Sequence, residues 1–293
     1  MSDFTPVPSP YLVPFDGTFD VSKAPTAPPA DAPGKKENVE ALERSVGKLA
    51  KLQEKLFADD RYSLLIVFQA LDAAGKDGTL RAVMSGVNPA GCEVTAFKAP
   101  SSEELDHDFL WRCARALPER GRIGIWNRSH YEEVLVVRVH PEFLKGQKLP
   151  GKHDDLDGLW HERFESIREF ERHHARNGTI MLKFWLNVSK DEQRDRLIER
   201  IDEPDSNWKF NAGDIKERAL WPQYMHAYEE ALRATSRPWA PWYAIPADSK
   251  SYMRRVVADI IVDTLKSLPL RYPEVDADAL AEMQQLRAKL AAE

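Results

Sequence analysis

The sequence predicts an α/β fold in which a doubly wound parallel sheet of five strands has helices on both faces. Five short apolar stretches, most of them rich in β-branched or aromatic residues, have the composition of buried strands. Helical patterns separate these stretches along the chain. Such alternation requires crossover connections, which are typical of parallel sheets. The expected strands span residues 64–68, 94–97, 123–126, 180–186 and 242–245.

The helices are predicted from apolar residues that recur at spacings of three and four positions. Residues 38–56 show the pattern, because Val39, Leu42, Val46 and Leu49 follow one another at these spacings. The further helices are expected at residues 78–87, 102–117, 129–138, 156–176, 190–201, 214–234 and 250–267.

The two ends of the chain differ from the central domain expected at residues 36–270. Residues 1–35 hold eight of the twenty prolines and little periodic apolar pattern, which predicts an extended arm lying over a neighbouring element or a partner. Residues 271–293 predict a terminal helix that packs on the body or on another subunit. The apolar stripe of that helix consists of Leu280, Met283, Leu286 and Leu290.

Composition narrows the class of protein. The chain has 293 residues, 43% of them apolar, and no apolar run of the length that spans a membrane. The N-terminus lacks the basic-then-apolar pattern of a secretion signal. The two cysteines, Cys92 and Cys113, lack CxxC spacing and are expected to be reduced, buried thiols in a cytoplasmic protein. A net charge of −6 argues against a general nucleic-acid binder.

The first predicted strand runs into a loop of small residues that can bind phosphate. Small residues let the backbone turn tightly and point its N–H groups at an anion, and the following helix adds its positive N-terminal end. Lys76 would place a cation on a transferring phosphoryl group, and Asp72 offers a hard oxygen suited to Mg²⁺. Ala70 and Asp77 break the strict G-x-x-x-x-G-K-[ST] pattern, so a plain glycine turn is the alternative. The loop residues expected to contact phosphate are Ala73, Ala74, Gly75, Asp77, Gly78 and Thr79.

The third predicted strand ends in Asn127 and Arg128. Ligands of open α/β sheets bind beyond the carboxyl ends of the strands, so both side chains should face the crevice of the phosphate loop. Asn127 offers a carbonyl oxygen to a metal or its water, without a charge. Arg128 is a bidentate phosphate partner, with a strand-end ion pair as the alternative. His130 is expected to be structural, since no second His or Cys lies at metal spacing.

Residues 189–235 predict a mobile helical lid. Cationic side chains on a closing helix-loop-helix can neutralise charge on a transferring phosphoryl group. Seven basic and nine acidic residues lie between positions 189 and 218, however, which is also typical of a solvated helical face.

Four motifs of this chain resemble those of the family-2 polyphosphate kinases and occur in the same order, over about residues 36–270. The resemblance implies a thymidylate-kinase-like P-loop fold with a helical lid, and an enzyme that moves a terminal phosphoryl group between polyphosphate and a nucleotide with Mg²⁺, or Mn²⁺ in its place. The motifs are the loop at 70–79, Asn127-Arg-Ser-His-Tyr-Glu132-Glu-Val-Leu, Glu203-Pro-Asp-Ser-Asn-Trp208-Lys209-Phe and Ala240-Pro-Trp-Tyr-Ala-Ile-Pro-Ala-Asp248-Ser-Lys250.

The resemblance assigns roles to individual residues. It implies that Asp72, Lys76 and Arg128 are catalytic, that Asp72 and Asn127 hold the metal, and that Asn127 and Glu132 bind the nucleotide. Many members have Asp-Arg-Ser-Trp-Tyr-Asn where this chain has Asn127-Arg-Ser-His-Tyr-Glu132, which resembles the subgroup that accepts AMP as well as ADP. The implied lid cations, which would bind polyphosphate, are Arg194, Arg200 and Lys209.

The sequence therefore predicts a reversible transfer of the terminal phosphoryl group of polyphosphate to AMP or ADP, with GMP and GDP as further candidate acceptors. ATP is the corresponding product or donor, nucleic acid and membranes are not expected partners, and a homo-oligomer, dimer or tetramer, is expected. One alternative is an ATP-dependent nucleoside monophosphate kinase. Ala70 and Asp77 argue against it, because such kinases normally have the first glycine and the Ser or Thr of the loop pattern at these positions. The other is a non-catalytic polyphosphate-binding protein. The presence of Asp72, Lys76 and Arg128 argues against it, because a protein that only binds has no need of a metal-holding acid.

Overall fold

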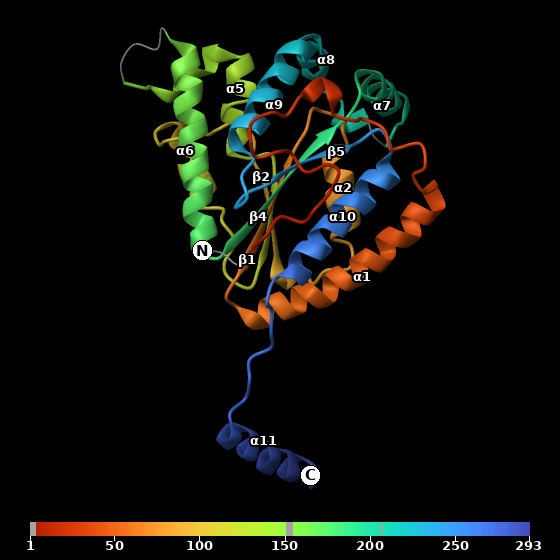
Figure 1. The fold of residues 1–293 in the computed structure, drawn as a ribbon, viewed down its shortest axis with the longest axis vertical. Coiled ribbons are helices and arrows are strands. Elements are labelled where there is room, and N and C mark those ends of the chain that lie inside the picture. The colour runs from red at the N-terminus through yellow and green to blue at the C-terminus, as the bar shows by residue number, and fades with distance from the viewer. Residues whose placement is uncertain (1–3, 151–154, 206) are drawn as a thin grey trace.

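A computed structural model of the chain describes residues 4–150, 155–205 and 207–293. Within them lies one parallel sheet of five strands in the order β2-β3-β1-β4-β5 (Figure 1). The predicted α/β class and the five predicted strands are confirmed, each strand within a few residues of its expected bounds. The strands are β1 Ser63–Gln69, β2 Cys92–Ala96, β3 Ile123–Asn127, β4 Thr179–Asn187 and β5 Trp242–Pro246.

Strand β1 is the centre of the sheet, and every one of its residues is buried. Alternate side chains point to opposite faces, as strand geometry requires. Leu64, Ile66 and Phe68 join one apolar cluster, and Leu65 and Val67 join another. The pairing of Phe68 with Asn127 brings the carboxyl ends of β1 and β3 to the same edge of the sheet.

Helices cover both faces of the sheet. Helices α1 (Lys35–Asp59), α2 (Lys76–Val83) and α10 (Lys250–Ser267) supply side chains to the cluster on one face, and α1 and α10 lie side by side in Figure 1. Helices α6 (Leu156–Arg176) and α9 (Trp221–Thr235) pack on the other face. The short 3₁₀ segments are η1 Val21–Lys23, η2 Pro89–Gly91 and η4 Pro141–Gln147.

Three helices predicted as single elements are divided. Residues 102–117 form α3 (Ser102–Leu105) and α4 (Trp111–Ala114), because the Asp108 carboxylate accepts the Leu110 N–H and interrupts the helix. Residues 129–138 form η3 (His130–Glu133) and α5 (Val136–Val139).

The third divided helix belongs to the lid, where residues 212–235 form α8 (Ala212–Ala219) and α9. Pro222, in the first turn of α9, has no N–H to donate to the preceding turn, so a new helix starts there. The other lid elements are α7 (Lys190–Asp202) and η5 (Asn207–Lys209).

The N-terminal arm, residues 4–34, packs on the α/β domain of the same chain. Leu12 forms an antiparallel bridge with Tyr243 of β5, and the Val13 N–H donates to the Trp242 carbonyl at 2.9 Å. Phe4, Tyr11 and Val13 are buried. The arm thereby covers the free edge of β5, which would otherwise expose unpaired backbone groups.

The C-terminal helix α11 (Ala277–Leu290) stands apart from the body, at the end of an extended segment of residues 268–276 (Figure 1). It has no buried residue, so within the described residues it does not pack on its own body. No helix in the described ranges is long and apolar enough to cross a membrane. Both cysteines are free, and burial raises the pKa of Cys92 to about 11 and that of Cys113 to about 12.

Candidate active site

The phosphate loop connects the end of β1 to the start of α2. Ala73 (φ 60°) and Gly75 (φ 102°) both have left-handed backbone conformations, which make the turn tight. A Cβ at Gly75 would lie 3.2 Å from the Met253 methyl, so glycine suits both the conformation and the space. Helix α2 begins at Lys76, two residues before the expected start, and directs its N-terminus at the loop. Thr79 is buried, and its hydroxyl donates to the Gly75 carbonyl at 2.9 Å.

Lys76 is held by the loop itself. Its Nζ donates to the Ala70 carbonyl at 2.6 Å and to the Leu71 carbonyl at 3.3 Å. Burial lowers the pKa of Lys76, and the nearby carboxylates of Asp72 and Glu132 oppose that shift. Neutral carbonyls are weaker partners for an ammonium group than phosphate oxygens, so a bound phosphate can displace them.

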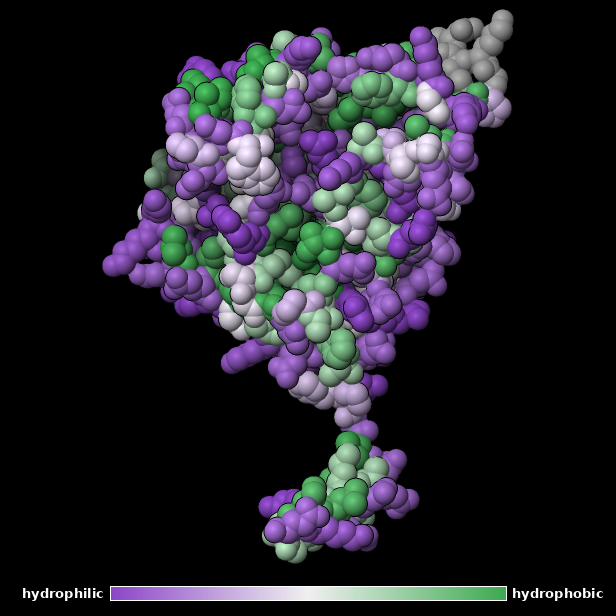
Figure 2. Space-filling model, turned by 180° about the vertical axis from the view of Figure 1, so that it is seen from behind, coloured by the Kyte–Doolittle hydropathy of each residue, from purple (hydrophilic) through white to green (hydrophobic). Residues whose placement is uncertain are grey.

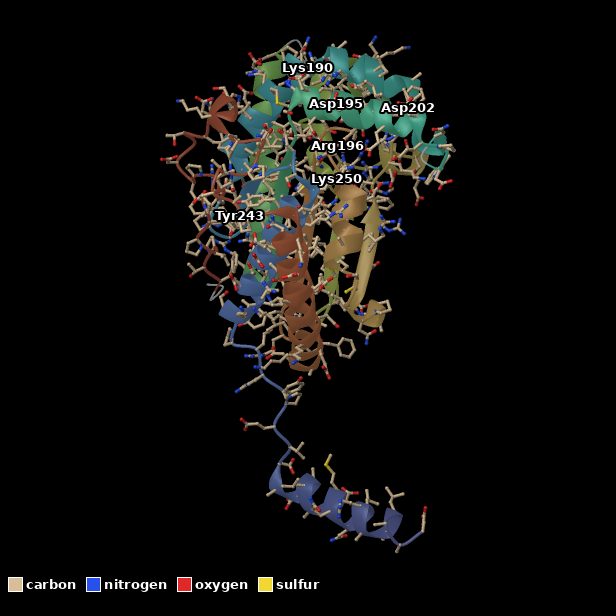
Figure 3. The ribbon with its side chains drawn as sticks, turned by 90° about the vertical axis from the view of Figure 1, so that its right-hand side faces the viewer. Lys190, Asp195, Arg196, Asp202, Tyr243 and Lys250 are labelled. Atoms are coloured by element: carbon tan, nitrogen blue, oxygen red, sulfur yellow. The ribbon has the colours of Figure 1, made fainter. Side chains whose placement is uncertain are left out.

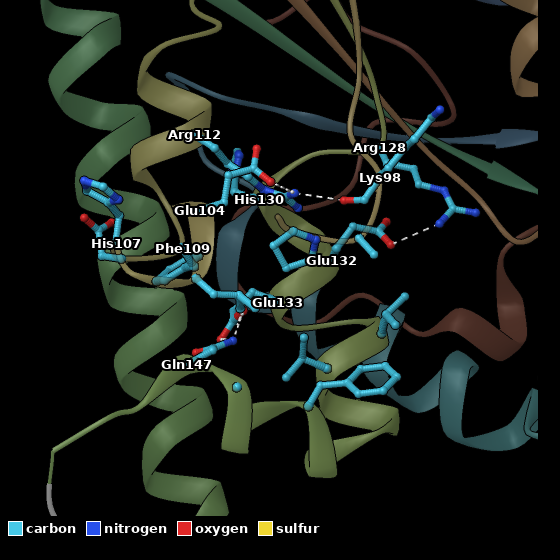
Figure 4. Close-up of a pocket in the computed structure, with 18 of the residues that line it drawn as sticks. Lys98, Glu104, His107, Phe109, Arg112, Arg128, His130, Glu132, Glu133 and Gln147 are labelled. Atoms are coloured by element: carbon cyan, nitrogen blue, oxygen red, sulfur yellow. Dashed lines mark hydrogen bonds and ion pairs between the residues drawn. The ribbon is translucent and has the colours of Figure 1, made fainter. Parts of the chain in front are cut away.

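Arg128 joins the ends of β1 and β3. Its backbone is left-handed (φ 64°), which turns the side chain toward the phosphate loop. One guanidinium nitrogen lies 3.0 Å from Asp72 Oδ1. The other lies 3.6 Å from Glu132 Oε2 (Figure 4). The strand-end ion pair considered from the sequence is therefore present, and it lies in the predicted crevice. Both Arg128 (39%) and Asp72 (34%) remain partly exposed to the crevice.

Asn127 contacts Asp77 and not Asp72. Its amide nitrogen donates to Asp77 Oδ1 at 2.7 Å, which links the end of β3 to the first turn of α2. The described residues contain no group of three or more His, Cys, Asp or Glu side chains arranged to hold a metal ion. Mg²⁺ needs only one or two protein carboxylates when substrate phosphates and water complete its shell. The oxygen donors at the loop, Asp72, Asp77 and Asn127, fit that mode of binding.

Glu132 lies between two cavities. Burial raises the pKa of Glu132, against the opposing effect of Arg128 and Lys76. With its amide nitrogen turned toward Glu132, Gln69 donates to Oε1 at 3.0 Å. Gln69 at the end of β1 and Arg128 after β3 therefore both hold the Glu132 carboxylate. A carboxylate that only complemented a helix N-terminus would lack these two side-chain contacts.

The first cavity, of about 480 Å³, lies between α4, η3 and η4 (Figure 4). Its lining combines apolar and aromatic side chains with both basic and acidic groups, and the carboxylates outnumber the lysines and arginines. Representative lining residues are Lys98, His107, Phe109, Arg112, Glu133 and Phe143. The second cavity, of about 310 Å³, lies under the lid and is more polar. Its polar lining residues include Asp72, Gln193, Asp214, Glu217, Arg218 and Tyr224. Arg128 and Glu132 line both cavities.

The lid is tied to the phosphate loop by residues outside the predicted site. Gln193 donates to the Asp72 carbonyl at 2.9 Å. Arg196 is buried and donates to the Ala74 carbonyl at 2.9 Å and to the Ala247 carbonyl at 2.6 Å. Figure 3 shows Arg196 beneath α7, on the side of the body. Neither residue stands out in the sequence, because polar side chains in a charged helix are usually solvated. The three-residue spacing between Gln193 and Arg196, which places them on one face of α7, is the only local signal.

The predicted lid cations occupy different positions. Arg194 is 51% exposed and forms ion pairs with Asp191 and Asp195, so the structure does not bring it into the cavity. The physical reason is helical phase, since position 194 lies about 100° around α7 from the inward residue Gln193. Arg200 faces inward, 3.0 Å from Asp214 Oδ2. Lys209 ends η5, and its side chain lies outside what the structure describes.

His130 is part of a separate buried cluster. It is 3% exposed and lies 3.4 Å from Glu171, which also pairs with Lys183 at 2.7 Å. Burial lowers the pKa of His130. The sequence-based expectation of a structural histidine agrees with this burial, and the residue also lines the first cavity described above.

Comparisons with known proteins agree with this geometry. The family model described as polyphosphate kinase 2 matches residues 33–271. An ADP-polyphosphate phosphotransferase of Rhodopseudomonas palustris is 49% identical over 271 residues, which is 92% of this chain and 94% of that protein. An AMP/ADP-polyphosphate phosphotransferase of Meiothermus ruber is 46% identical over 265 residues, 90% of this chain and 95% of that one. The crystal structure of polyphosphate kinase 2 from Arthrobacter aurescens TC1 superimposes with a TM-score of 0.85 at 38% identity, over 94% of each chain.

Proposed function

The chain belongs to the polyphosphate kinase 2 family, and from that premise we propose that it transfers the terminal phosphoryl group of inorganic polyphosphate to AMP or ADP. One observation carries the proposal: Lys76, Asp72 and Arg128 converge at the carboxyl edge of the sheet, where the two cavities meet. Arg128 lines both cavities, so phosphate-bearing substrates can reach it from either one. The transfer is reversible, and GMP and GDP are further acceptors.

The acceptor nucleotide occupies the first cavity. Its apolar and aromatic lining suits a base and ribose, and Arg112 lies over the Phe97 ring at 5.3 Å, at one side of that cavity. The acceptor phosphate then points to Arg128 and Glu132 at the inner end. Lys98 and Arg112 line the same cavity, where Arg112 pairs with Glu104 at 3.4 Å.

The polyphosphate donor lies across the phosphate loop and leaves over α2. Arg81 and Arg254 support this route. Burial lowers the pKa of Arg254 most, and the nearby charges of Arg81 and Arg196 lower it further. Among the described residues, the buried Arg254 Nε has no hydrogen-bond partner. A Cβ at Gly78 would lie 2.9 Å from an Arg254 guanidinium nitrogen, so glycine keeps α2 close to that charge. A polyanion that leaves the loop over α2 would neutralise the positive charge of these two arginines.

Phosphoryl transfer requires the protein to position the two substrates and to neutralise their charge, without a covalent bond between protein and phosphate. An acceptor phosphate oxygen attacks the terminal phosphoryl group in line, the phosphoanhydride bond to the rest of the donor breaks, and the polyphosphate shortened by one phosphate leaves. Lys76 leaves its loop carbonyls for the transferring group, and Arg128 exchanges Asp72 for phosphate oxygens. Lid closure, guided by Gln193 and Arg196, excludes water.

The family requires a divalent metal. Asp72 and Asn127 would hold Mg²⁺, or Mn²⁺ in its place, and the cation supplies charge neutralisation between the donor and acceptor phosphates. Release of Asp72 from Arg128 on phosphate binding frees its carboxylate for that role.

The protein works as a homo-oligomer, a dimer or a tetramer, without nucleic-acid or membrane partners. A cytoplasmic location is supported by its nucleotide acceptors. The two rival functions are not favoured by the relatives, which are named as polyphosphate-dependent phosphotransferases.

The test is a transfer assay with purified protein, Mg²⁺, AMP or ADP, and either polyphosphate or ATP as donor, with products separated by chromatography. We expect polyphosphate to phosphorylate both acceptors and ATP to phosphorylate AMP far more slowly. Robust ATP-driven phosphorylation of AMP without polyphosphate would favour a nucleoside monophosphate kinase, and binding without turnover would favour a non-catalytic protein.

A further inference from the structure

Helix α11 presents an apolar stripe that its own body does not cover. The four large side chains of this stripe are 49–69% exposed. Figure 2 shows apolar surface on the helix that projects from the molecule. They are Leu280, Met283, Leu286 and Leu290. An isolated helix shorter than roughly 12–15 residues is marginal in water, so a helix of 14 residues needs a packing partner to be well formed. The helix also lies beyond residues 33–271, the part of the chain that matches the family.

The stripe follows a heptad repeat. Met283 and Leu290 are seven residues apart and occupy one core position, and Ala279 and Leu286 occupy the other. Leu280 lies beside this seam at a flanking position and widens the apolar face on one side. Apolar residues at successive core positions are typical of a helix that pairs with another helix.

The charges of α11 are complementary to those of a second, oppositely directed copy. Its first half and the preceding cap carry Asp276, Asp278 and Glu282, whereas its last turn carries Arg287 and Lys289. An antiparallel pair places the acidic half of each helix against the basic half of the other and opposes the two helix dipoles. A parallel pair would place the two acidic ends together.

The register of the antiparallel pair follows from the heptad. When Met283 packs against Leu286 of the second copy, Leu290 packs against Ala279 of that copy. The flanking residue Glu282 then lies opposite Lys289 of the second copy, and the reciprocal ion pair forms by symmetry. The hydrophobic seam and the charges therefore select the same alignment.

We propose that α11 is a self-association element, which pairs antiparallel with α11 of a second copy of this chain. The contact is isologous, so it closes after two subunits. Figure 1 places α11 at the end of the molecule opposite the lid helices α7 and α8, so this contact leaves both candidate active sites open. The pairing is independent of the proposed phosphoryl transfer.

Sedimentation velocity of the full chain over a range of concentrations tests the proposal. Leu286→Glu should raise the dissociation constant of the α11-dependent step at least roughly tenfold, because it introduces a charge into the seam. Gln285→Glu is the matched control, since position 285 lies on the opposite face of the helix, and it should associate like the unmodified chain. Equal association of the Leu286→Glu variant and the unmodified chain would overturn the proposal.

Charge reversal tests the orientation without removing an apolar residue. Glu282→Lys and Lys289→Glu should each weaken association, and the double variant should restore it. In a parallel pair Glu282 would instead face Arg287, so a silent Lys289→Glu would contradict the antiparallel arrangement. Failure of the double variant to recover would show that α11 docks elsewhere, which also overturns the proposal. Phosphoryl transfer per subunit, measured in parallel, should be unchanged in all variants and separates this test from that of the proposed function.

Discussion

Lys76 and Lys183 are both lysines whose pKa is lowered by burial, but their surroundings differ. Lys183 is fully buried, and its Nζ donates to Glu171 (2.7 Å), to the Tyr131 hydroxyl (2.8 Å) and to the Thr235 carbonyl (2.9 Å). All three ammonium protons therefore have protein acceptors. Within the described part of the chain, Lys76 donates to two carbonyls of its own loop and to no carboxylate, although Asp72 and Glu132 are near enough to affect its pKa.

This comparison separates a structural cation from a catalytic one. Burial lowers the pKa of Lys183 to about 8, and Lys183 and His130 in turn outweigh the effect of burial on Glu171 and leave its pKa lowered. The result is a closed ion pair that needs no ligand. Lys76, Asp72 and Arg128 form an open set, in which each charge can be offered to a phosphate or to a cation.

The largest expected effect is on the stability of the closed cluster. Lys183→Met should lower the free energy of unfolding by about 3–5 kcal/mol, because it leaves the Glu171 carboxylate buried without its cation. Denaturant unfolding measures the change. The double variant Lys183→Met/Glu171→Gln is the control and should recover part of the loss, since it removes the unpaired charge. A loss below about 1 kcal/mol in the single variant would show that the cluster is not a structural unit.

The open set should respond in activity and not in stability. Lys76→Ala and Asp72→Ala should each reduce turnover by roughly a hundredfold to a thousandfold, or about 3–4 kcal/mol of activation free energy, with an unchanged thermal melt. The reason is that each removes a preorganised charge at the transferring group or the metal. Lys266→Ala, on the exposed side of α10, is the surface control. More than about a tenth of the original turnover in either site variant would contradict the assignment.

The two arginines of α7 provide a smaller contrast. Arg196→Ala should cost about 2–3 kcal/mol of stability and reduce turnover about tenfold, because it leaves the Ala74 and Ala247 carbonyls without a donor and releases the phosphate loop. Arg194→Ala should stay within about 0.5 kcal/mol, since its partners are exposed. Thermal melts and initial rates of both variants measure the difference, and a larger effect at Arg194 would contradict it.

These residues also show how far sequence reasoning reaches. The apolar strands and the loop that ends in Lys76 follow from local pattern, so the sheet and the positions of Asp72 and Arg128 at its carboxyl edge were predictable. The role of Arg196 depends on four carbonyls brought together from two distant loops, and no local pattern encodes them. Arg194 lies two positions before Arg196 and is also an arginine. Only the direction in which each side chain points from α7 distinguishes the two.

A substrate-specific effect is expected at Glu132, at the boundary between the open set and the acceptor cavity. Glu132 approaches Arg128 from the helix that leaves β3 and can hold a water or the metal where AMP has no β-phosphate. Glu132→Asn should reduce turnover with AMP about tenfold more than with ADP, which is close to 1.4 kcal/mol of discrimination. Rates with the two acceptors, measured side by side, decide the matter. Equal losses, or no loss, would leave Glu132 as a residue that only complements a helix N-terminus.

The smallest expected effect is the pH dependence of stability at the same residue. Burial raises the pKa of Glu132 in the folded protein, so ionisation of this carboxyl destabilises the fold as the pH rises through that pKa. Glu132→Gln, which cannot ionise, should therefore melt at a higher temperature than the unmodified chain near pH 8. The advantage should fade as the pH falls from the raised pKa of the folded protein toward about 4.3, the usual pKa of glutamate in an unfolded chain, and should be absent below it. Calorimetric melts from pH 4 to 8 measure it, with exposed Glu274→Gln as the matched control. An advantage that grows as the pH falls would mean that Arg128 and Lys76 outweigh burial, and Glu132 would then belong with Glu171 among the closed, charge-paired carboxylates.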